Sequence, residues 1–249
     1  NVGGADGFGA YVGVLDMDAA STVIASDNLG SGLWIGNSRE EESHIRGQIY
    51  CERNGTPNWP GDGGFVVQAE HDGDTIYKGN VTIEAGACIY ARHNKALAGV
   101  LNSWILNIES GATVIADDNE QSGFVNSLDA RATIKNGANV FATNNRQHGI
   151  LNYAGAGDLS VAKGFFFIEG GAHVTANNNA SAGIYNTVNE RSYGSFDDDG
   201  NPLYNPENDC FTIQGGADIS ADGNGSYGIY NEGGIFTIEN GANISSCNN

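Results

Sequence analysis

One motif recurs six times between residue 81 and the end of the chain, and it constrains the fold more than any other feature of the sequence. Each copy contains an isoleucine, a Gly-Ala pair, a small residue four positions after the Ala and an Asn seven positions after it. Five copies continue into Gly-apolar-apolar-Asn. Successive copies are 25, 26, 34, 45 and 25 residues apart, measured on Ala87, Ala112, Ala138, Ala172, Ala217 and Ala242. A period of about 20 to 50 residues indicates an array of stacked structural units.

The apolar residues within each copy alternate with a period of two, which is the period of a β-strand. In the first copy Val81 and Ile83 would face one way, and Thr82 and Glu84 the other. Gly and Asn separate the alternating segments, and both residues tolerate sharp bends. The pattern predicts three short strands per copy, which is one coil of a parallel β-helix with coils about 4.8 Å apart.

Equivalent residues of successive coils should then stack in columns inside the helix. One predicted inward column is Ile83, Ile108, Ile134, Ile168, Ile213 and Ile238, and another is Val100, Phe124, Ile150, Ile184 and Ile229. In each copy an Asn lies two positions after the residue of the second column, as Asn102 does after Val100, so its side chain should point to the same inward face. We therefore expect an inward ladder of amides that bond one another and the backbone, formed by Asn102, Asn126, Asn152, Asn186 and Asn231.

The N-terminal part keeps the pattern less regularly. Residues Leu15–Asn28 align with the copy that begins at Val81, and Gly47–Asn54 fits a partial coil. Residues 56–80 are rich in turn-forming residues and are expected to be an insertion, as are 153–165 and 187–210. The sequence thus predicts a single all-β domain over residues 1–249, with seven to eight coils of three strands each. We expect it to be a monomeric fragment of a longer protein.

The formal net charge of −19, with 11 basic residues, argues against nucleic acid as a partner, because phosphate backbones require Lys and Arg patches. The sequence has no run of about 18 apolar residues, so we expect no membrane insertion. The four cysteines do not stack in pairs in the predicted register, and we expect free thiols at Cys51, Cys88, Cys210 and Cys247.

The Thr/Asn-Ile-Glu-x-Gly-Ala blocks, followed by Ala-x-x-Asn and Gly-apolar-apolar-Asn, resemble the repeats of the right-handed parallel β-helix superfamily called pectin-lyase-like. Within it, they most resemble the repetitive domains of bacterial cell-surface adhesin-like proteins. The resemblance covers about residues 12–249 and implies a right-handed helix and a secreted or surface-attached protein. It implies no single activity, because the superfamily contains lyases, hydrolases, phage tailspikes and adhesins.

A bend that recurs after the small residue offers candidate catalytic groups. Asp117 and Asp118 lie in one copy, and Arg146 and His148 in the next, so stacking should bring them near one another. Paired carboxylates flanked by His and Arg are the groups that glycoside hydrolysis uses. The alternative is a solvated turn whose charges alternate in sign from coil to coil.

An outward column of apolar and aromatic residues is the candidate binding surface. The position before each ladder Asn is Leu101, Val125, Leu151, Tyr185 and Tyr230, and Trp104 and Tyr153 lie just past it. Exposed apolar columns are uncommon on monomer surfaces. Two expected insertions begin beside this column, so it either binds a sugar or a protein between them or packs beneath them.

Asp197, Asp199 and Asn201 alternate before and after a Gly, as in the first half of a calcium loop. This segment departs from a calcium loop at two positions: Ser occupies the first position, and the twelfth position has no Glu. The alternative is an acidic surface loop. We expect no required cofactor, with Ca²⁺ as the one candidate.

The sequence favours a recognition or adhesion module that binds a polysaccharide, a host glycan or a host protein. Uniform repeats without a complete catalytic signature support this interpretation. The alternatives are a lyase or hydrolase acting on an acidic polysaccharide and a structural stalk.

Overall fold

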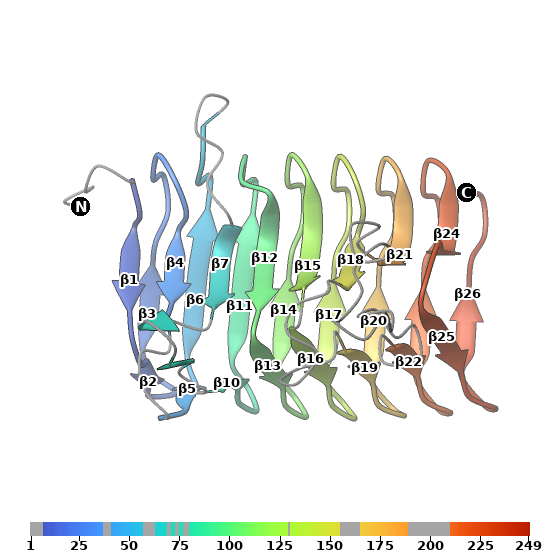
Figure 1. The fold of residues 1–249 in the computed structure, drawn as a ribbon, viewed down its shortest axis with the longest axis horizontal. Coiled ribbons are helices and arrows are strands. Elements are labelled where there is room, and N and C mark those ends of the chain that lie inside the picture. Colours follow the sequence, from blue (N-terminus) through green and yellow to red (C-terminus); the bar gives the residue numbers. More distant parts are fainter. Residues whose placement is uncertain are drawn as a thin grey trace, which may run out of the picture.

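The computed structural model describes residues 7–36, 41–56, 63–68, 71–72, 75–76, 80–128, 130–154, 165–188 and 210–249. Three parallel sheets of eight strands each run the length of the molecule, and each coil contributes one strand to every sheet (Figure 1). The described residues contain no helix long and apolar enough to cross a membrane. The predicted right-handed parallel β-helix, with eight coils, is confirmed.

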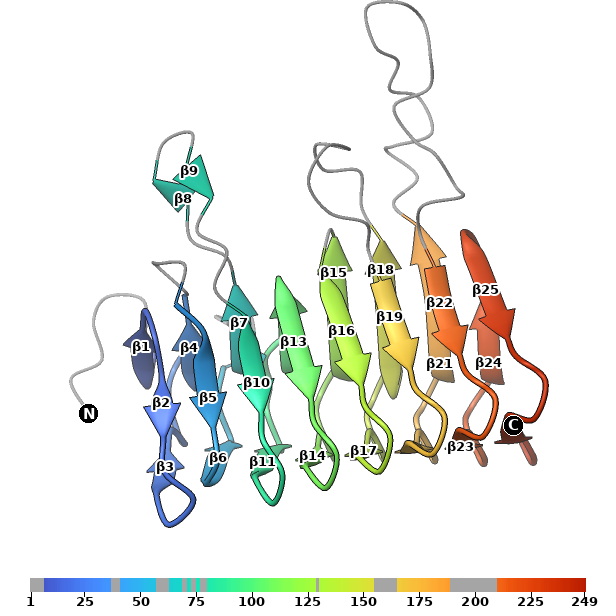
Figure 2. The ribbon, with the colours of Figure 1, turned by 90° about the horizontal axis from the view of Figure 1, so that it is seen from below.

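Sheet A contains β1 (Ala10–Val12), β4 (Leu33–Ile35), β7 (Gly63–Gln68), β12 (Ala98–Ser103), β15 (Ser122–Leu128), β18 (Ile150–Ala154), β21 (Ala182–Val188) and β24 (Tyr227–Asn231). Sheet B contains β2 (Asp16–Met17), β5 (Ser43–Ile45), β10 (Val81–Ile83), β13 (Ile105–Ile108), β16 (Arg131–Ile134), β19 (Phe165–Ile168), β22 (Cys210–Ile213) and β25 (Ile235–Ile238). Sheet C contains β3 (Thr22–Ile24), β6 (Gln48–Glu52), β11 (Cys88–Arg92), β14 (Thr113–Ile115), β17 (Asn139–Phe141), β20 (His173–Thr175), β23 (Asp218–Ser220) and β26 (Asn243–Ser245). The short antiparallel pair β8 (His71–Asp72) and β9 (Thr75–Ile76) stands apart from these sheets (Figure 2).

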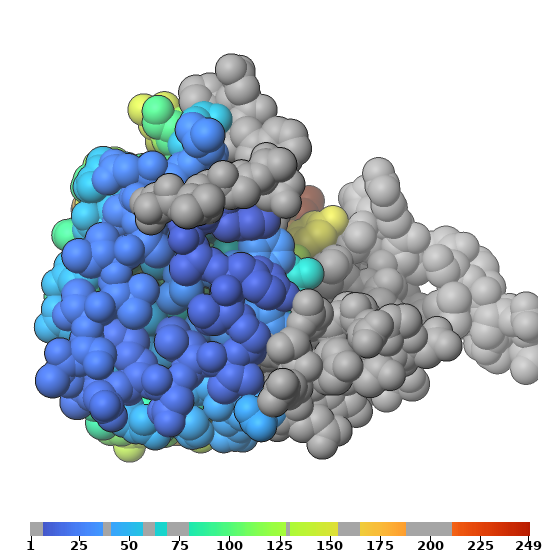
Figure 3. Space-filling view, turned by 90° about the vertical axis from the view of Figure 1, so that its left-hand side faces the viewer, coloured from blue at the N-terminus to red at the C-terminus, as the bar shows by residue number. Residues whose placement is uncertain are grey.

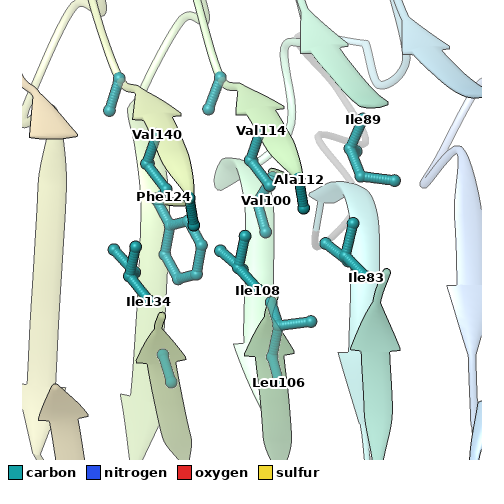
Figure 4. Packing of buried hydrophobic residues seen from close by; sticks show 14 of the residues in the cluster. Ile83, Ile89, Val100, Leu106, Ile108, Ala112, Val114, Phe124, Ile134 and Val140 are labelled. Carbon is teal, nitrogen blue, oxygen red and sulfur yellow. The ribbon is translucent and has the colours of Figure 1, made fainter. Parts of the chain in front are cut away.

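The interior is filled by the predicted apolar columns. Ile83, Ile108 and Ile134 are partners in strand register and are almost completely buried (Figure 4). The column continues toward the N-terminus through Ile45 and Met17. Burial stabilises each such side chain by about 1.5–3 kcal/mol relative to exposure, so the columns are the main source of stability. Figure 3 faces the first coil, at the N-terminal end of the stack.

The predicted inward Asn ladder is confirmed at the corner where sheet A ends. The amide Nδ2 of each Asn donates to the Oδ1 of the Asn in the next coil, at 2.7 or 2.8 Å, along Asn102, Asn126, Asn152, Asn186 and Asn231. Four of these five residues are buried, and Asn231 in the last coil is exposed. Their polar groups are therefore satisfied without water.

A second Asn ladder, longer than the first, was not predicted. It lies at the corner between sheets C and A and uses the Asn seven positions after each repeat Ala, together with Asn28 and Asn54 of the first two coils. Both the backbone N–H and the Nδ2 of one Asn donate to the Oδ1 of the next, at 2.8 to 3.1 Å, along Asn28, Asn54, Asn94, Asn119, Asn145, Asn179, Asn224 and Asn249. We call this the long Asn ladder. Each member follows a residue in left-handed backbone conformation, with φ between 53° and 66°.

The expectation that residues 56–80 form an insertion is wrong for Gly63–Gln68. These residues form β7, a central strand of sheet A, and Phe65 stacks on Val100 in the core. The motif was obscured because Val67 occupies the position that Asn102 takes in the next coil. Ile35 takes the same position one coil earlier.

The cysteine prediction is confirmed for the three cysteines whose side chains the structure describes. Cys51, Cys88 and Cys247 are free thiols. Cys51 is fully buried and pairs in register with Ala91, so it acts as a small core residue. Cys210 begins β22.

Candidate functional site

Asp117 and Asp118 make contacts with opposite neighbouring coils. One Asp117 carboxylate oxygen accepts hydrogen bonds from Thr143 Oγ1 at 2.7 Å and Asn144 Nδ2 at 2.9 Å. Asp118 has a φ of 53° and lies 2.9 Å from Nδ1 of His93. Each carboxylate therefore ties one turn to the turn of an adjacent coil.

The same turn carries an equivalent ion pair in the first two coils. Arg53 donates to both carboxylate oxygens of Asp27, at 2.6 and 2.7 Å. Exposed pairs of this kind contribute little to stability, because water and salt screen the two charges. These ion pairs between neighbouring coils agree with a solvated turn whose charges alternate in sign. The sequence offered this turn as the alternative to a catalytic bend.

His148 and Arg146, the other two candidates in the bend, do not join these carboxylates. The ring of His148 lies 4.6 Å from that of Tyr185, and its Nδ1 accepts the backbone N–H of Ala182 at 3.3 Å. Burial lowers the pKa of His148. The backbone of Arg146 donates to the carbonyl of Asn119, while its side chain is exposed. Within the described ranges, no hydrogen bond or ion pair joins His148 or Arg146 to Asp117 or Asp118.

The strand register of the predicted outward column on sheet A is confirmed and continues to the first coil, although Val66 and Val125 within it are buried. Strand register joins its members in all eight coils: Tyr11, Trp34, Val66, Leu101, Val125, Leu151, Tyr185 and Tyr230. We call this set the outer apolar column. It runs parallel to the helix axis on the outer face of sheet A.

Four aromatic rings lie in a row at the C-terminal end of this column, three of them stacked and the fourth, His148, tilted by 42°. Tyr185 and Tyr230 are stacked with centroids 5.3 Å apart, and Tyr230 stacks on Tyr227 at 4.6 Å. His148 covers Tyr185 at the other end. We call His148, Tyr185, Tyr230 and Tyr227 the aromatic stack. Tyr227 is its accessible end, with 51 % of its surface exposed.

Tyr227 was missed by the sequence reasoning, although the sequence contains a signal for it. In strand register Tyr227 pairs with Ala182 of the preceding coil, and Ser122 and Ala98 hold the equivalent position three and four coils earlier. The residue before the motif Gly is Ala or Ser in three of the five copies, and His148 and Tyr227 in the other two are local departures from the repeat. Such departures are where a solenoid can carry a specific site.

A carboxylate lies beside the aromatic stack. The hydroxyl of Tyr185 donates to Glu232, and Thr187 Oγ1 donates to the same oxygen at 2.9 Å. These two bonds lower the pKa of Glu232, the Tyr185 bond having the larger effect. Burial and the bond to Glu232 raise the pKa of Tyr185 to about 12. The edge of the stack thus presents an ionised carboxylate, one oxygen of which accepts hydrogen bonds from both Tyr185 and Thr187.

The other two candidate aromatic residues lie in different environments. Tyr153 is half-buried and occupies the next outward column of sheet A, between Ser127 and Thr187. Trp104 is only 7 % exposed and packs in the core, so the expectation that it lies on the binding surface is wrong. The chain turns at this point, because the Oδ1 of Asn102 accepts the backbone N–H of Trp104.

The candidate calcium ligands Asp197, Asp199 and Asn201 lie outside the described residues. In the part of the chain that the structure does describe, no three His, Cys, Asp or Glu side chains are grouped so that they could hold a metal ion.

Comparison with known proteins identifies no relative. No protein-family model matches the chain, and neither a curated protein nor a solved structure matches it.

Proposed function

We propose that this chain is an extracellular recognition module that binds a glycan at the aromatic stack on the outer face of sheet A. The observation that carries the proposal is the exposed ring of Tyr227 at the end of a row of four aromatic side chains, the three tyrosines of which are stacked. The resemblance of the repeats to bacterial adhesin-like domains supports a secreted or surface-attached location.

The chemistry of the stack suits a sugar. A tyrosine ring offers a rigid apolar face with a polar rim, and a pyranose has an apolar face of C–H groups surrounded by hydroxyls. Glu232 and Thr187 supply polar groups beside the rings. Because Tyr230 is stacked on both Tyr185 and Tyr227, the rings hold one another in place. A prearranged site loses less conformational entropy on binding.

The charge of the protein restricts the class of glycan. With a formal net charge of −19 and Glu232 beside the stack, polyanionic chains would be repelled. The proposal therefore concerns neutral or amino sugars. An acidic polysaccharide, the substrate class of the enzymatic alternative, is disfavoured by the same electrostatics.

The enzymatic alternative would use Asp117 and Asp118. Their contacts do not favour it, because Asp118 is paired with His93 and Asp117 bonds to Thr143 and Asn144. The stalk alternative has more support, since two Asn ladders tie the coils together. It differs from the proposal in requiring no ligand.

Binding to a panel of plant, microbial and mucin polysaccharides tests the proposal. Affinity electrophoresis would compare the wild-type protein with Tyr227→Ala, with Phe141→Ala as the matched control. Phe141 is also an outward aromatic residue on a strand, 38 % exposed, but lies on sheet C. We expect Tyr227→Ala to weaken binding at least about tenfold, a loss of about 1.4 kcal/mol, and Phe141→Ala to leave it unchanged.

Three other outcomes would contradict the proposal. Equal losses in both variants would indicate nonspecific adsorption to aromatic surface. Retention of a deglycosylated mucin would favour a protein ligand. No retention on any polymer, with no new reducing ends, would favour the stalk.

A further inference from the structure

An apolar stripe lies on the outer face of sheet C, away from the proposed glycan site. Strand register aligns its four side chains along the helix axis in coils 2 to 5, and we call Tyr50, Tyr90, Ile115 and Phe141 the sheet C stripe. The rings of Tyr50 and Tyr90 are parallel, with centroids 4.6 Å apart, and Phe141 is exposed. Each of these coils has a coil on either side of it, so the stripe is part of the lateral surface of the helix and not of an end of the stack.

A row of charged side chains lies beside the stripe, two positions further along each strand. Glu52, Arg92 and Asp117 occupy this row in coils 2, 3 and 4. Arg92 is held in place, because its Nε and Nη2 donate to Oε1 of Glu52 at 3.0 and 2.6 Å. Its guanidinium carbon also lies 5.1 Å from the centre of the Tyr90 ring. The row therefore changes sign between coils 3 and 4, from a fixed arginine to an aspartate.

The turn that follows this row changes in the same direction, from His93 in coil 3 to Asp118 in coil 4. The row on the other side of the stripe is neutral and consists of Gln48, Cys88, Thr113 and Asn139. The outer face of these coils thus has an apolar centre, one neutral edge and one charged edge.

The charged edge carries little net charge, although the formal net charge of the whole chain is −19. In coils 2 to 5 it holds two arginines and three carboxylates, a sum of −1 with histidine neutral: Arg53, Arg92, Glu52, Asp117 and Asp118. Both arginines are paired with carboxylates of the same chain. A second acidic copy can therefore approach this face with little repulsion, whereas a strongly basic partner would find the carboxylates already neutralised.

The arrangement of the face is complementary to itself. If two copies packed sheet C against sheet C about a two-fold axis parallel to the strands, the coil order of one copy would be reversed relative to the other. With the axis between coils 3 and 4, Arg92 would face the partner's Asp117, and Asp117 would face the partner's Arg92. Tyr90 would lie on the partner's Ile115. A two-fold interface pairs the same patch on both copies in this way.

We propose that sheet C is the interface of a weak homodimer, in which the two sheet C stripes pack together and Arg92 pairs with the partner's Asp117. The area agrees with a weak dimer. An outward position covers about 6.6 Å along the strand by about 4.8 Å between coils, so three positions in each of coils 1 to 6 cover roughly 600 Å² per copy. The total of about 1,200 Å² is at the lower end for specific interfaces, and we expect a dissociation constant between about 10 µM and 1 mM. Below this range the protein would be the monomer that the sequence predicts.

Sedimentation equilibrium at protein concentrations from about 10 µM to 1 mM tests the proposal. We expect the wild-type protein to dimerise reversibly. Arg92→Asp should weaken dimerisation at least about tenfold, because two carboxylates then face each other. The double variant Arg92→Asp/Asp117→Arg should restore it, since both signs are exchanged. Arg53→Asp is the matched control: Arg53 is also paired with a carboxylate but would face the partner's Asn144, so the change should be less than about threefold.

Three outcomes would overturn the proposal, provided that circular dichroism shows each variant to be folded. A wild-type protein that stays monomeric up to about 1 mM would leave the stripe to a different partner. A double variant as weak as Arg92→Asp would contradict the register, and equal losses in Arg92→Asp and Arg53→Asp would reduce the effect to net charge. Such a dimer is dissociated at low micromolar concentration, so glycan binding can be measured independently and Phe141→Ala keeps its use as a control there.

Discussion

Gly99 lies directly against Asn119 of the next coil: a Cβ placed on Gly99 would stand 2.5 Å from the Nδ2 of that amide. The same relationship joins Gly123 to Asn145 and Gly149 to Asn179, each at 2.6 Å. The motif Gly and the Asn of the long Asn ladder, which are the two most regular positions of the repeat, therefore depend on each other. The glycine leaves the space that the long Asn ladder occupies.

Replacement of Gly99 should be costly because of this contact. Gly99→Ala would also bring its Cβ within 2.8 Å of the carbonyl oxygen of Ala91, so the backbone must shift. Overpacking of this kind typically costs about 1–3 kcal/mol of unfolding free energy, measurable by urea denaturation. Gly86→Ala is the comparison, since its φ is +81° but nothing lies within 4 Å of the added Cβ. A larger loss in Gly86→Ala than in Gly99→Ala would contradict the steric explanation.

The long Asn ladder should be sensitive to loss of a single member. In Asn119→Ala, the backbone N–H and the Nδ2 of Asn94 lose their shared acceptor inside the protein. Each unsatisfied buried donor costs about 1–3 kcal/mol, so we expect a loss of about 2–5 kcal/mol in urea unfolding. Asn107→Ala, on the outward face of β13, should change the same quantity by less than about 0.5 kcal/mol. Similar losses in the two variants would show that the ladder does not stabilise the fold.

Acidification should destabilise the aromatic stack through His148. Burial lowers the folded-state pKa of this residue below its unfolded value of about 6.5, so the folded protein binds the proton less readily. The contribution of neutral His148 is fully present above the unfolded pKa and is lost as the pH falls through the folded pKa. Protonation would also place an N–H at Nδ1, opposite the N–H of Ala182.

The measurement is the pH dependence of urea unfolding for wild-type protein and His148→Gln. The wild type should lose more stability than the variant on passing below about pH 6.5. His173→Gln is the control, because the side chain of His173 is 57 % exposed, and it should follow the wild type. Parallel pH profiles for all three proteins would rule out the role of His148.

The ionisation of Glu232 should report the hydrogen bond from Tyr185. Tyr185→Phe removes the bond that contributes most to the lowered pKa of Glu232, so this pKa should rise toward its usual range. Thr187→Val removes the second bond and should raise the pKa by less. NMR titration of the Glu232 side-chain carboxyl carbon would measure both. A larger rise of the Glu232 pKa in Thr187→Val than in Tyr185→Phe would show that the Thr187 bond, and not the Tyr185 bond, has the larger effect.

The core columns could be predicted because two independent regularities in the sequence agree. Alternation assigns Ile83 and Val81 to the inside, and the repeat spacing aligns Ile83 with Ile108. The long Asn ladder was harder to predict, although its residues recur without exception. Each member, such as Asn119, follows a residue in left-handed backbone conformation, so the strand alternation that placed Asn102 inside does not give the direction of its side chain.

The errors in the candidate site have a common cause, which is that alternation fails where the chain bends. Trp104 was placed outside by counting past Asn102, but the backbone turns there and directs the ring inward. Tyr227 and Tyr230 are three residues apart and yet stack on one face, and the strand register skips Gly228 between them. The roles of Asp117, Asp118, Arg146 and His148 in chemistry stay predictions.

The long Asn ladder also bears on how a protein of this kind can change length. Every member offers the same donors to one neighbouring coil and the same acceptor to the other, as Asn119 does between Asn94 and Asn145. If a coil were duplicated, its Asn could therefore form the same hydrogen bonds to the ladder Asn residues of both neighbouring coils. The stretch from the repeat Ala to the Gly is 12 residues from Ala87 to Gly99 and 11 in the four later copies, while the extra length of the long repeats falls elsewhere. Evolution by gene duplication can thus proceed in whole coils, and the one extra residue between Ala87 and Gly99 still leaves Gly99 against Asn119.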